Sequence, residues 1–343
     1  MNNRHDEARA IFGFTLIGSG IAHHERKVKN RSKTALFLGG VLVVSLVIAV
    51  LFGSERLNFS DLTAEQRVIL FDIRIPRVFL AASVGAALAA AGAALQSLLR
   101  NPLAEPYLLG VSNGAALGTM LAFVFFGSIE FSRPVLAFVG AGAATLAVYK
   151  IAQSRAGMNV ERLVLSGVIV TTFLSSIIVL LTSLLDAARL RSFTFWLLGD
   201  LSQATMHGVY FAAAVAVVGI TVLYSQAKAL NLMMIGERDA LDLGVEVARV
   251  RLIVFVSVSA LIGATVAASG SVGYVGLIVP HLVRLASGSD NRTVIPFAAV
   301  AGASFVVLAD LAARTAIAPR ELPVGAVTAL IGAPLFIYLL RKA

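Results

Sequence analysis

A polar segment between two long apolar runs carries the densest charge in the sequence. Seven charged side chains fall within residues 236–252, whereas only 14% of the whole chain is charged. They are Glu237, Arg238, Asp239, Asp242, Glu246, Arg249 and Arg251. Leu241, Val245 and Ala248 can share one helical face, and two glycines, at 236 and 244, divide the segment. An apolar stripe with a mixed-charge rim predicts a surface for another protein, although a solvated loop has the same composition.

Residues for catalysis are sparse elsewhere. The five histidines, at positions 5, 23, 24, 207 and 281, form no metal-ligand spacing such as HExxH. The sequence has no G-x-x-x-x-G-K-[ST] phosphate loop and no cysteine, so it lacks a P-loop for ATP, a thiolate site and a disulfide. We therefore expect a chain that is not an enzyme and that binds no metal or cofactor.

The elements that position the polar segment are membrane spans. The chain has 343 residues and is 58% hydrophobic, with a mean hydropathy of +0.88, which leaves too little polar surface for a water-soluble domain. Several apolar runs are long enough to cross a bilayer. We predict an all-α polytopic membrane protein with about ten transmembrane helices, at 34–53, 76–99, 111–127, 134–153, 162–185, 206–225, 250–269, 274–286, 294–313 and 323–340. The eighth, with Pro280 and His281, is too short to cross alone and is expected to be a half-helix packed within protein.

Charge sets the orientation of these helices. With the amino terminus inside, 19 of the 28 Lys and Arg residues and the whole net charge of +9 fall on one face. This asymmetry follows the positive-inside rule, so the basic charge requires no nucleic-acid partner. Both termini, a basic tail at 1–33 and the loop 229–248 are then cytoplasmic, and residues 34–343 form one transmembrane domain. Because the run 34–53 is long enough to span, we interpret it as a retained helix rather than a signal peptide.

Ion-coupled transport usually requires acids inside the spans, and the sequence offers few. The nearest is Asp310, close to the outer end of its helix and one turn before Arg314, so a local ion pair accounts for it. The sequence thus indicates a pathway whose energy source lies on another chain. A secondary transporter that works without an ATPase is the alternative, and a membrane scaffold that transports nothing is a third hypothesis.

An internal similarity relates two of the spans. VGAALAAAG at 84–92 resembles IGATVAASG at 262–270, in helices of opposite direction. This pattern predicts an inverted-topology repeat, which is common in transporters. Small residues at such spacing also recur wherever membrane helices pack closely, so close packing is the alternative explanation.

Six motifs give the chain a family resemblance. NLMMIGERDALDLG at 231–244 resembles the coupling loop of the permease subunits of ABC importers for iron siderophores, haem and cobalamin. Five others are similar to that family in order and spacing: RIPR (74–77), the run 91–115 with RNPLAEP, GYVGLIVPHLVRL (273–285), GASFVVLADLAAR (302–314) and ELPVGAVTALIGAPLFIYLL (321–340). The resemblance covers nearly everything from about residue 56 onward, and it is closest to the cobalamin permeases.

The resemblance implies a type II ABC importer permease fold in the bacterial inner membrane. It implies a homodimer of ten-span subunits, with two ATP-binding cassette ATPase subunits docked inside and a periplasmic substrate-binding protein outside. The cargo would be an iron siderophore, haem or cobalamin, which are metal chelates or corrinoids. ATP hydrolysis on the partner subunits would drive uptake, and membrane lipid would be the remaining partner.

The resemblance also assigns docking roles to individual residues. The ATPase would couple through Met234, Gly236, Glu237, Arg238, Asp239, Leu241, Leu243 and Gly244. At the outer face, Arg74, Arg77 and Arg314 would pair with carboxylates of the binding protein, a ring of weak contacts that sets orientation and association rate. Headgroup anchoring and the local Asp310 pair are the alternatives. Between the first two arginines, Pro76 is expected to fix a turn.

Two segments would form the cytoplasmic gate: Asn101 with Leu103, and Val160 with Glu161. The cobalamin permeases have small hydroxyl residues at the second segment, so a branched apolar residue and an acid give this gate a different chemistry.

The fifth span is expected to line a pathway along the dimer axis. Ser166, Thr172 and Ser176 supply uncharged hydroxyls for it, although such side chains equally satisfy hydrogen bonds between helices. A short helix around Trp196 is expected at the outer interface.

Overall fold

The protein is almost entirely helical. The computed structural model describes residues 31–55, 57–58, 61–126, 132–154, 157–158 and 160–342, so most of the predicted tail at 1–33 lies outside the described residues. The first described helix is Arg31–Leu51. The elements that follow are α2 (Ala64–Val68), η1 (Ile69–Arg74), α3 (Ile75–Leu98), η2 (Pro106–Leu109), α4 (Val111–Phe125), α5 (Ser132–Ala152), β1 (Gln153–Ser154), β2 (Gly157–Met158), α6 (Val160–Thr182), α7 (Ala187–Leu197), α8 (Met206–Ser225), α9 (Ala227–Ile235), α10 (Glu237–Asp242), α11 (Val247–Ser269), α12 (Val275–Ser287), α13 (Asn291–Thr315) and α14 (Val324–Lys342).

The predicted spans are confirmed in number and place. Within the described residues, seven helices are long and apolar enough to cross a membrane, and three shorter apolar helices, in α4, α12 and α14, bring the total to ten. The half-helix predicted at 274–286 is the 13-residue α12, which contains Pro280. The 15-residue α4 is also short, which the sequence analysis did not anticipate.

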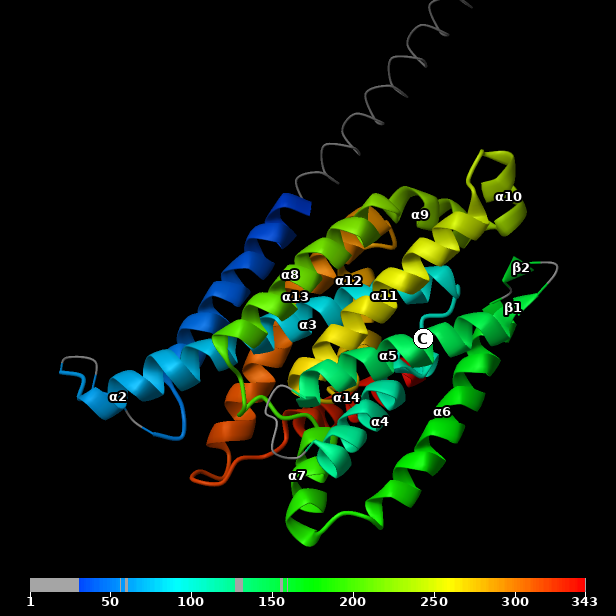
Figure 1. Cartoon of the computed structure of the whole chain (residues 1–343). Coiled ribbons are helices and arrows are strands. Elements are labelled where there is room, and N and C mark those ends of the chain that lie inside the picture. Colours follow the sequence, from blue (N-terminus) through cyan, green and yellow to red (C-terminus); the bar gives the residue numbers. More distant parts are fainter. Residues whose placement is uncertain are drawn as a thin grey trace, which may run out of the picture.

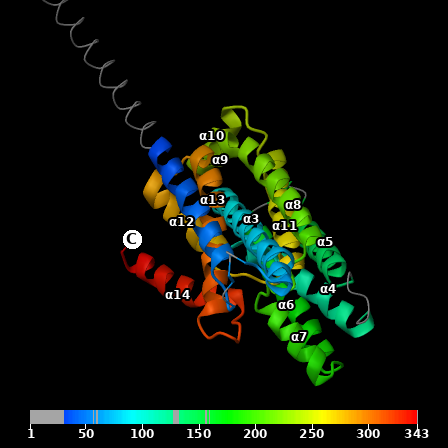
Figure 2. The same cartoon turned by 90° about the vertical axis from the view of Figure 1, so that its left-hand side faces the viewer.

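The long helix α3 runs through the middle of the bundle (Figure 2). Of its 24 residues, 19 are buried, and it packs against α8, α11, α12 and α13. Glycine permits this crowding, because a Cβ on Gly85 would overlap the backbone of Gly302 in α13, and one on Gly92 would overlap that of Gly276 in α12. Close backbone contact of this kind holds helices together in lipid, where hydrophobic burial offers no driving force.

A continuous helix replaces the turn that the sequence analysis placed at Pro76. α2, η1 and α3 join into 35 helical residues, 64–98, so the predicted turn is wrong. η1 is a π-helical segment, and its wider turn changes the carbonyl positions just before Pro76, which enters at the start of α3. Arg74 and Arg77 therefore project from helical backbone.

The two ends of the bundle differ. Figure 1 shows α9, α10 and the β1–β2 hairpin at one end, and α2 and α7 toward the other. The hairpin pairs Gln153 with Met158 in antiparallel register. By the positive-inside rule, the end with α9 and α10 is cytoplasmic.

The order of helix lengths supports the internal repeat. α3, α4, α5 and α6 have 24, 15, 21 and 23 residues, and α11, α12, α13 and α14 have 23, 13, 25 and 19. The similar segments 84–92 and 262–270 lie in the first helix of each set. The inverted symmetry between the sets stays a prediction.

Candidate functional site: a cytoplasmic coupling surface and its links to the spans

The predicted docking segment folds as two short helices at the cytoplasmic end. α9 ends before Gly236, α10 runs for six residues, and Gly244 follows with a φ of +81°, a conformation that favours glycine. Met233 and Ala240 anchor the two helices by being buried against the bundle. The glycine breaks of the sequence analysis are therefore confirmed.

The apolar patch on this segment differs from the predicted stripe. Because Gly244 ends α10 before Val245 and Ala248, those two residues do not share a helical face with Leu241. The large apolar side chains that face outward here are instead Ile235, Leu241 and Leu243. With the exposed charges of Arg238 and Asp239, they form a surface with an apolar centre and a charged rim, which we call the coupling patch.

Glu237 connects α10 to two other parts of the chain. Its carboxylate accepts a hydrogen bond from Arg251 of α11 at 3.1 Å and lies 3.7 Å from the guanidinium of Arg100. Arg100 directly precedes Asn101, the first predicted gate residue. A displacement of α10 can therefore reach the gate turn through one side chain.

Hydrogen bonds beneath α9 form a second connection. Asn231 of α9 donates to Asp290 at 2.8 Å and accepts from the backbone N–H of Asn291 at 2.9 Å. The amide oxygen of Asn291 accepts from Ser97 of α3 at 2.7 Å and from Arg284 of α12 at 3.1 Å. Because Asn291 and Ser97 are buried, such a bonded network is rigid, and it joins α9 to α3, α12 and α13.

Asp290 also connects the first helix to this hydrogen-bond network. It caps α13 by accepting from the backbone N–H of Arg292, and its carboxylate pairs with Arg31 at 2.9 Å. Burial opposes the charge, but hydrogen bonds from Arg292, Asn231 and Arg31 outweigh it and hold the pKa of Asp290 well below its usual range. The carboxylate is therefore charged at neutral pH and keeps these partners.

The first predicted gate segment is an exposed turn between α3 and η2. The side-chain oxygen of Asn101 accepts from the backbone N–H of Leu103 at 2.8 Å, so the amide holds the turn. The second segment starts α6, where Val160 is the first residue and Glu161 is exposed in the first turn. An acid there suits the positive end of the helix.

The sequence analysis missed Glu105, which lies just beyond the gate turn. Its Oε1 accepts from the backbone N–H of Tyr274 at 3.1 Å. Nearby, the hydroxyl of Tyr107 donates to the carbonyl of Val272 and accepts from its N–H, both at 3.0 Å. These bonds fix the chain after the gate to the loop before α12. Glu105 lies between two spans, in the RNPLAEP motif, where a single acid has no distinguishing sequence pattern.

The predicted pathway residues of α6 fall on different sides of that helix. Thr172 and Ser176 are exposed, with their hydroxyls bonded to the carbonyls of Val168 and Thr172. Ser166 is buried in the subunit and does not share that exposed face, which corrects its assignment to an open pathway. Trp196 lies on the short helix α7, as predicted, and stacks on Phe193 at 6.2 Å between ring centres.

The three outer arginines are buried, which corrects the expectation that they are exposed for docking. Arg74, Arg77 and Arg314 expose only 3%, 5% and 4% of their surface. The Nε of Arg77 donates to both oxygens of Asp310, at 2.9 and 3.1 Å, and its Nη1 donates to Glu321 at 2.7 Å. Arg314 lies 3.5 Å from Asp310, so the predicted Asp310–Arg314 pair is present within a larger network.

Backbone carbonyls near the end of the first helix satisfy the rest of this network. Arg74 donates to Val50 at 2.9 Å, to Leu51 at 3.2 Å and to Glu55 at 2.9 Å, while Arg314 donates to Ala49. The last carbonyls of a helix lack intrahelical partners, and an unpaired charge is expensive in hydrocarbon. The guanidiniums of Arg74 and Arg314 therefore turn inward and join the first helix to η1 and α13.

Ten apolar helices, a cytoplasmic coupling patch and hydrogen-bonded links from that patch into the spans define a membrane transport subunit. A model described as the FecCD transport family matches residues 41–342, and the chain belongs to this family. The family resemblance of the sequence analysis is confirmed.

Named relatives agree with this assignment. The chain is 43% identical to the cobalamin import system permease protein BtuC of Halobacterium salinarum, over 80% of this chain and 74% of that one. It is 37% identical to the hemin transport system permease protein HmuU of Yersinia pestis, over 92% and 98%. It is 39% identical to the iron(3+)-hydroxamate import system permease protein FhuB of Bacillus subtilis, over 90% and 81%.

The fold has a solved counterpart. A structure of an inward-facing metal-chelate type ABC transporter superposes with a TM-score of 0.83 at 33% identity, covering 91% of this chain and all of the other. The chain is therefore the permease subunit of an ABC importer, a multi-pass membrane protein and not itself an enzyme.

Proposed function

We propose that two copies of this chain form the pathway of an importer in the inner membrane of a bacterium. The cargo is an iron siderophore, haem or cobalamin, and hydrolysis of ATP on two partner subunits drives its uptake. The names of the relatives, which cover cobalamin, hemin and iron(3+)-hydroxamate import, support this range of cargo. A soluble binding protein delivers the cargo at the outer face.

The coupling patch is the observation that carries the proposal. Exposed apolar side chains are unexpected on a cytoplasmic protrusion unless another protein covers them. The ATPase covers this patch, with Met234, Gly236, Glu237, Arg238, Asp239, Leu241, Leu243 and Gly244 as its coupling residues. Glu237 carries its movement to the gate turn through Arg100, and Asn231 carries it to α3 through Asn291, which is bonded to Ser97.

The exposed faces of α6 and α14 form the dimer contact and the pathway. Large apolar side chains stand unpartnered on both helices, including Val179 and Leu180 on α6 and Leu330 and Tyr338 on α14. Thr172 and Ser176 lie among them and give the pathway its hydroxyls. The gate lies at the cytoplasmic end of this face, formed by Asn101, Leu103, Val160 and Glu161.

At the outer face, the buried arginines organise the docking surface and do not pair with the binding protein directly. Arg77 holds Glu321, whose side chain is 36% exposed, and Arg74 holds the chain that follows the first helix. The binding protein then contacts the rim that these residues position.

Co-purification of the ATPase with variants of the coupling patch tests this proposal. Leu243→Asp places a charge in the apolar centre and is expected to lower co-purification of the ATPase at least about tenfold, a change equivalent to ~1.4 kcal/mol. Leu285→Asp is the matched control, since Leu285 is also 65% exposed and lies in the last turn of α12, outside the patch. Equal recovery with both variants would rule out the patch as the ATPase contact.

A further inference from the structure

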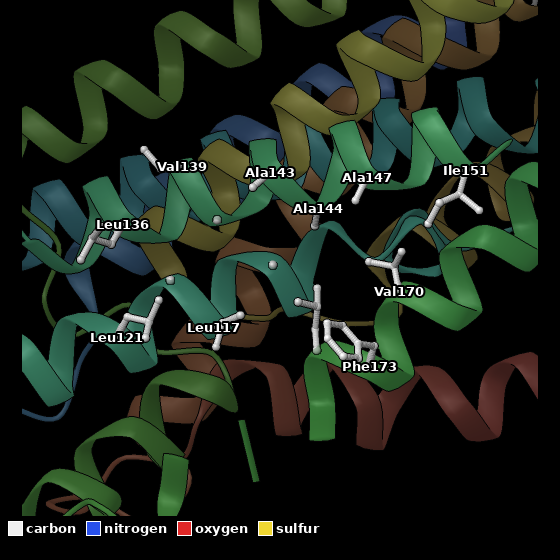
Figure 3. A pocket seen from close by; sticks show the side chains of 14 residues that line it. Leu117, Leu121, Leu136, Val139, Ala143, Ala144, Ala147, Ile151, Val170 and Phe173 are labelled. Carbon is white, nitrogen blue, oxygen red and sulfur yellow. The ribbon is translucent and has the colours of Figure 1, made fainter. Parts of the chain in front are cut away.

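An apolar groove lies between α4, α5 and α6. Its volume is about 500 Å³, within the range of roughly 300–1,000 Å³ that small-molecule sites occupy. Figure 3 shows Ala147 and Ile151 of α5 near Val170 and Phe173 of α6 at the walls. Because Ile151 and Phe173 are themselves mostly exposed, the groove opens on the outside of the subunit.

Glycine contacts make this groove a fixed feature of the fold. A Cβ on Gly114 would overlap the backbone of Gly140, and one on Gly118 would overlap the backbone of Leu136. α4 and α5 therefore touch through their backbones, and glycines and alanines line much of the groove beside the larger side chains. α6 stands away from them, and no side chain of the described residues fills the space between.

Two of the three groove residues of α6 face away from the pathway hydroxyls. Val170 and Leu174 line the groove, whereas Thr172 and Ser176 are exposed two residues further along the helix. At about 100° per residue, a separation of two residues turns a side chain by about 200°. Phe173 also lines the groove and points in nearly the same direction as Leu180, seven residues further on, so the groove adjoins the surface that we assign to the dimer.

Two cations stand at the cytoplasmic ends of the groove walls. Lys150 in the last turn of α5 and Arg162 in the first turn of α6 are exposed, and within the described part of the chain neither forms a hydrogen bond or an ion pair. Arg162 lies about three turns from Phe173 on the same side of α6, because eleven residues bring a helix back to nearly the same direction. The acid Glu161 points to the opposite side from Val170.

We propose that the groove binds an acyl chain of an anionic phospholipid of the cytoplasmic leaflet, with its phosphate held by Lys150 and Arg162. Basic pockets between transmembrane helices on the cytoplasmic side suit such headgroups. The apolar walls fit the acyl chain, and the two cations at their cytoplasmic ends fit the phosphate. The lipid then holds α6 to α4 and α5 and steadies the end of α6 that bears the gate.

Native mass spectrometry of the purified protein tests this site, with equal amounts of phosphatidylglycerol and phosphatidylcholine added. The unaltered protein is expected to retain phosphatidylglycerol preferentially. Lys150→Gln with Arg162→Gln is expected to weaken that preference about fivefold for each cation, equivalent to about 1 kcal/mol each. Ala143→Trp, at an exposed wall position, is expected to reduce retention of both lipids, and Ala143→Leu serves if the larger residue impairs folding.

Matched variants decide the outcome. Lys228→Gln with Arg341→Gln removes the same charge from exposed cytoplasmic positions away from the groove and is expected to leave the preference intact. An equal loss in this pair, or unchanged retention in both Ala143 variants, would overturn the proposal. So would efficient disulfide formation between two copies of Ala143→Cys, since the chain has no other cysteine and a second copy would then occupy the groove.

Discussion

Replacing Asp310 with alanine is expected to lower the free energy of unfolding by about 3–5 kcal/mol, the cost of breaking a buried ion pair by removing one partner. The substitution leaves the guanidiniums of Arg77 and Arg314 buried without their shared carboxylate, and only Glu321 remains for Arg77. Both arginines lie where solvent cannot compensate for the loss. Thermal unfolding of the purified protein in detergent measures the change.

Two variants separate the buried network from ion pairing in general. Asp310→Asn keeps a hydrogen-bond acceptor and is expected to lose less stability than Asp310→Ala. Glu246→Ala breaks the pair with Arg249, in which both side chains are 72% exposed, and is expected to change stability by no more than about 0.5 kcal/mol. If Asp310→Ala costs no more than Glu246→Ala, the buried network does not hold the outer ends of the spans together.

Replacing Glu237 and Asp239 with lysine is expected to abolish coupled transport while the protein still inserts and folds. At Glu237 the new cation would face Arg251 and Arg100, which now attract the carboxylate at 3.1 and 3.7 Å. At Asp239 the lysine would reverse the charge on the exposed rim of the coupling patch. We expect cargo uptake to fall at least about tenfold, equivalent to ~1.4 kcal/mol, with ATPase association lost or its hydrolysis uncoupled from uptake.

Single variants show which of the two acids accounts for the loss of cargo uptake. Asp239→Lys alone tests the rim, because Asp239 makes no ion pair with the described residues. Glu246→Lys makes the same charge change on the cytoplasmic side, outside α10, and is expected to retain uptake. Normal ATPase recovery and normal uptake in the double variant would remove the coupling role from these acids.

Apolar length and charge asymmetry were enough to predict the ten helices and their order. The run 206–225 matches helix α8 residue for residue, because nothing in it competes with helix formation. The extension of α3 back to residue 64 was not predicted. Its added part carries Glu65, Arg67 and Asp72, and it uses a π-helical turn to pass Pro76, which a search for apolar runs does not detect.

The site was predicted where its residues are close in sequence and missed where they are far apart. The short helices around Gly236 and Gly244 follow from local glycine positions. The burial of Arg77 depends on Asp310 and Glu321, which lie 233 and 244 residues away. The hydrogen bond between Asn231 and Asn291 likewise joins residues that are 60 positions apart. Single polar residues in such distant pairs leave no periodic pattern in the sequence.

Uptake into proteoliposomes tests most directly whether the subunit requires a separate ATPase for transport. The purified chain would be reconstituted with its binding protein and labelled cargo, either with the ATPase and ATP, or alone with an imposed proton or sodium gradient. We predict ATP-dependent uptake that stops when the ATPase is omitted or cannot hydrolyse ATP, and no uptake from either gradient. Gradient-driven uptake by the chain without an ATPase would contradict this account.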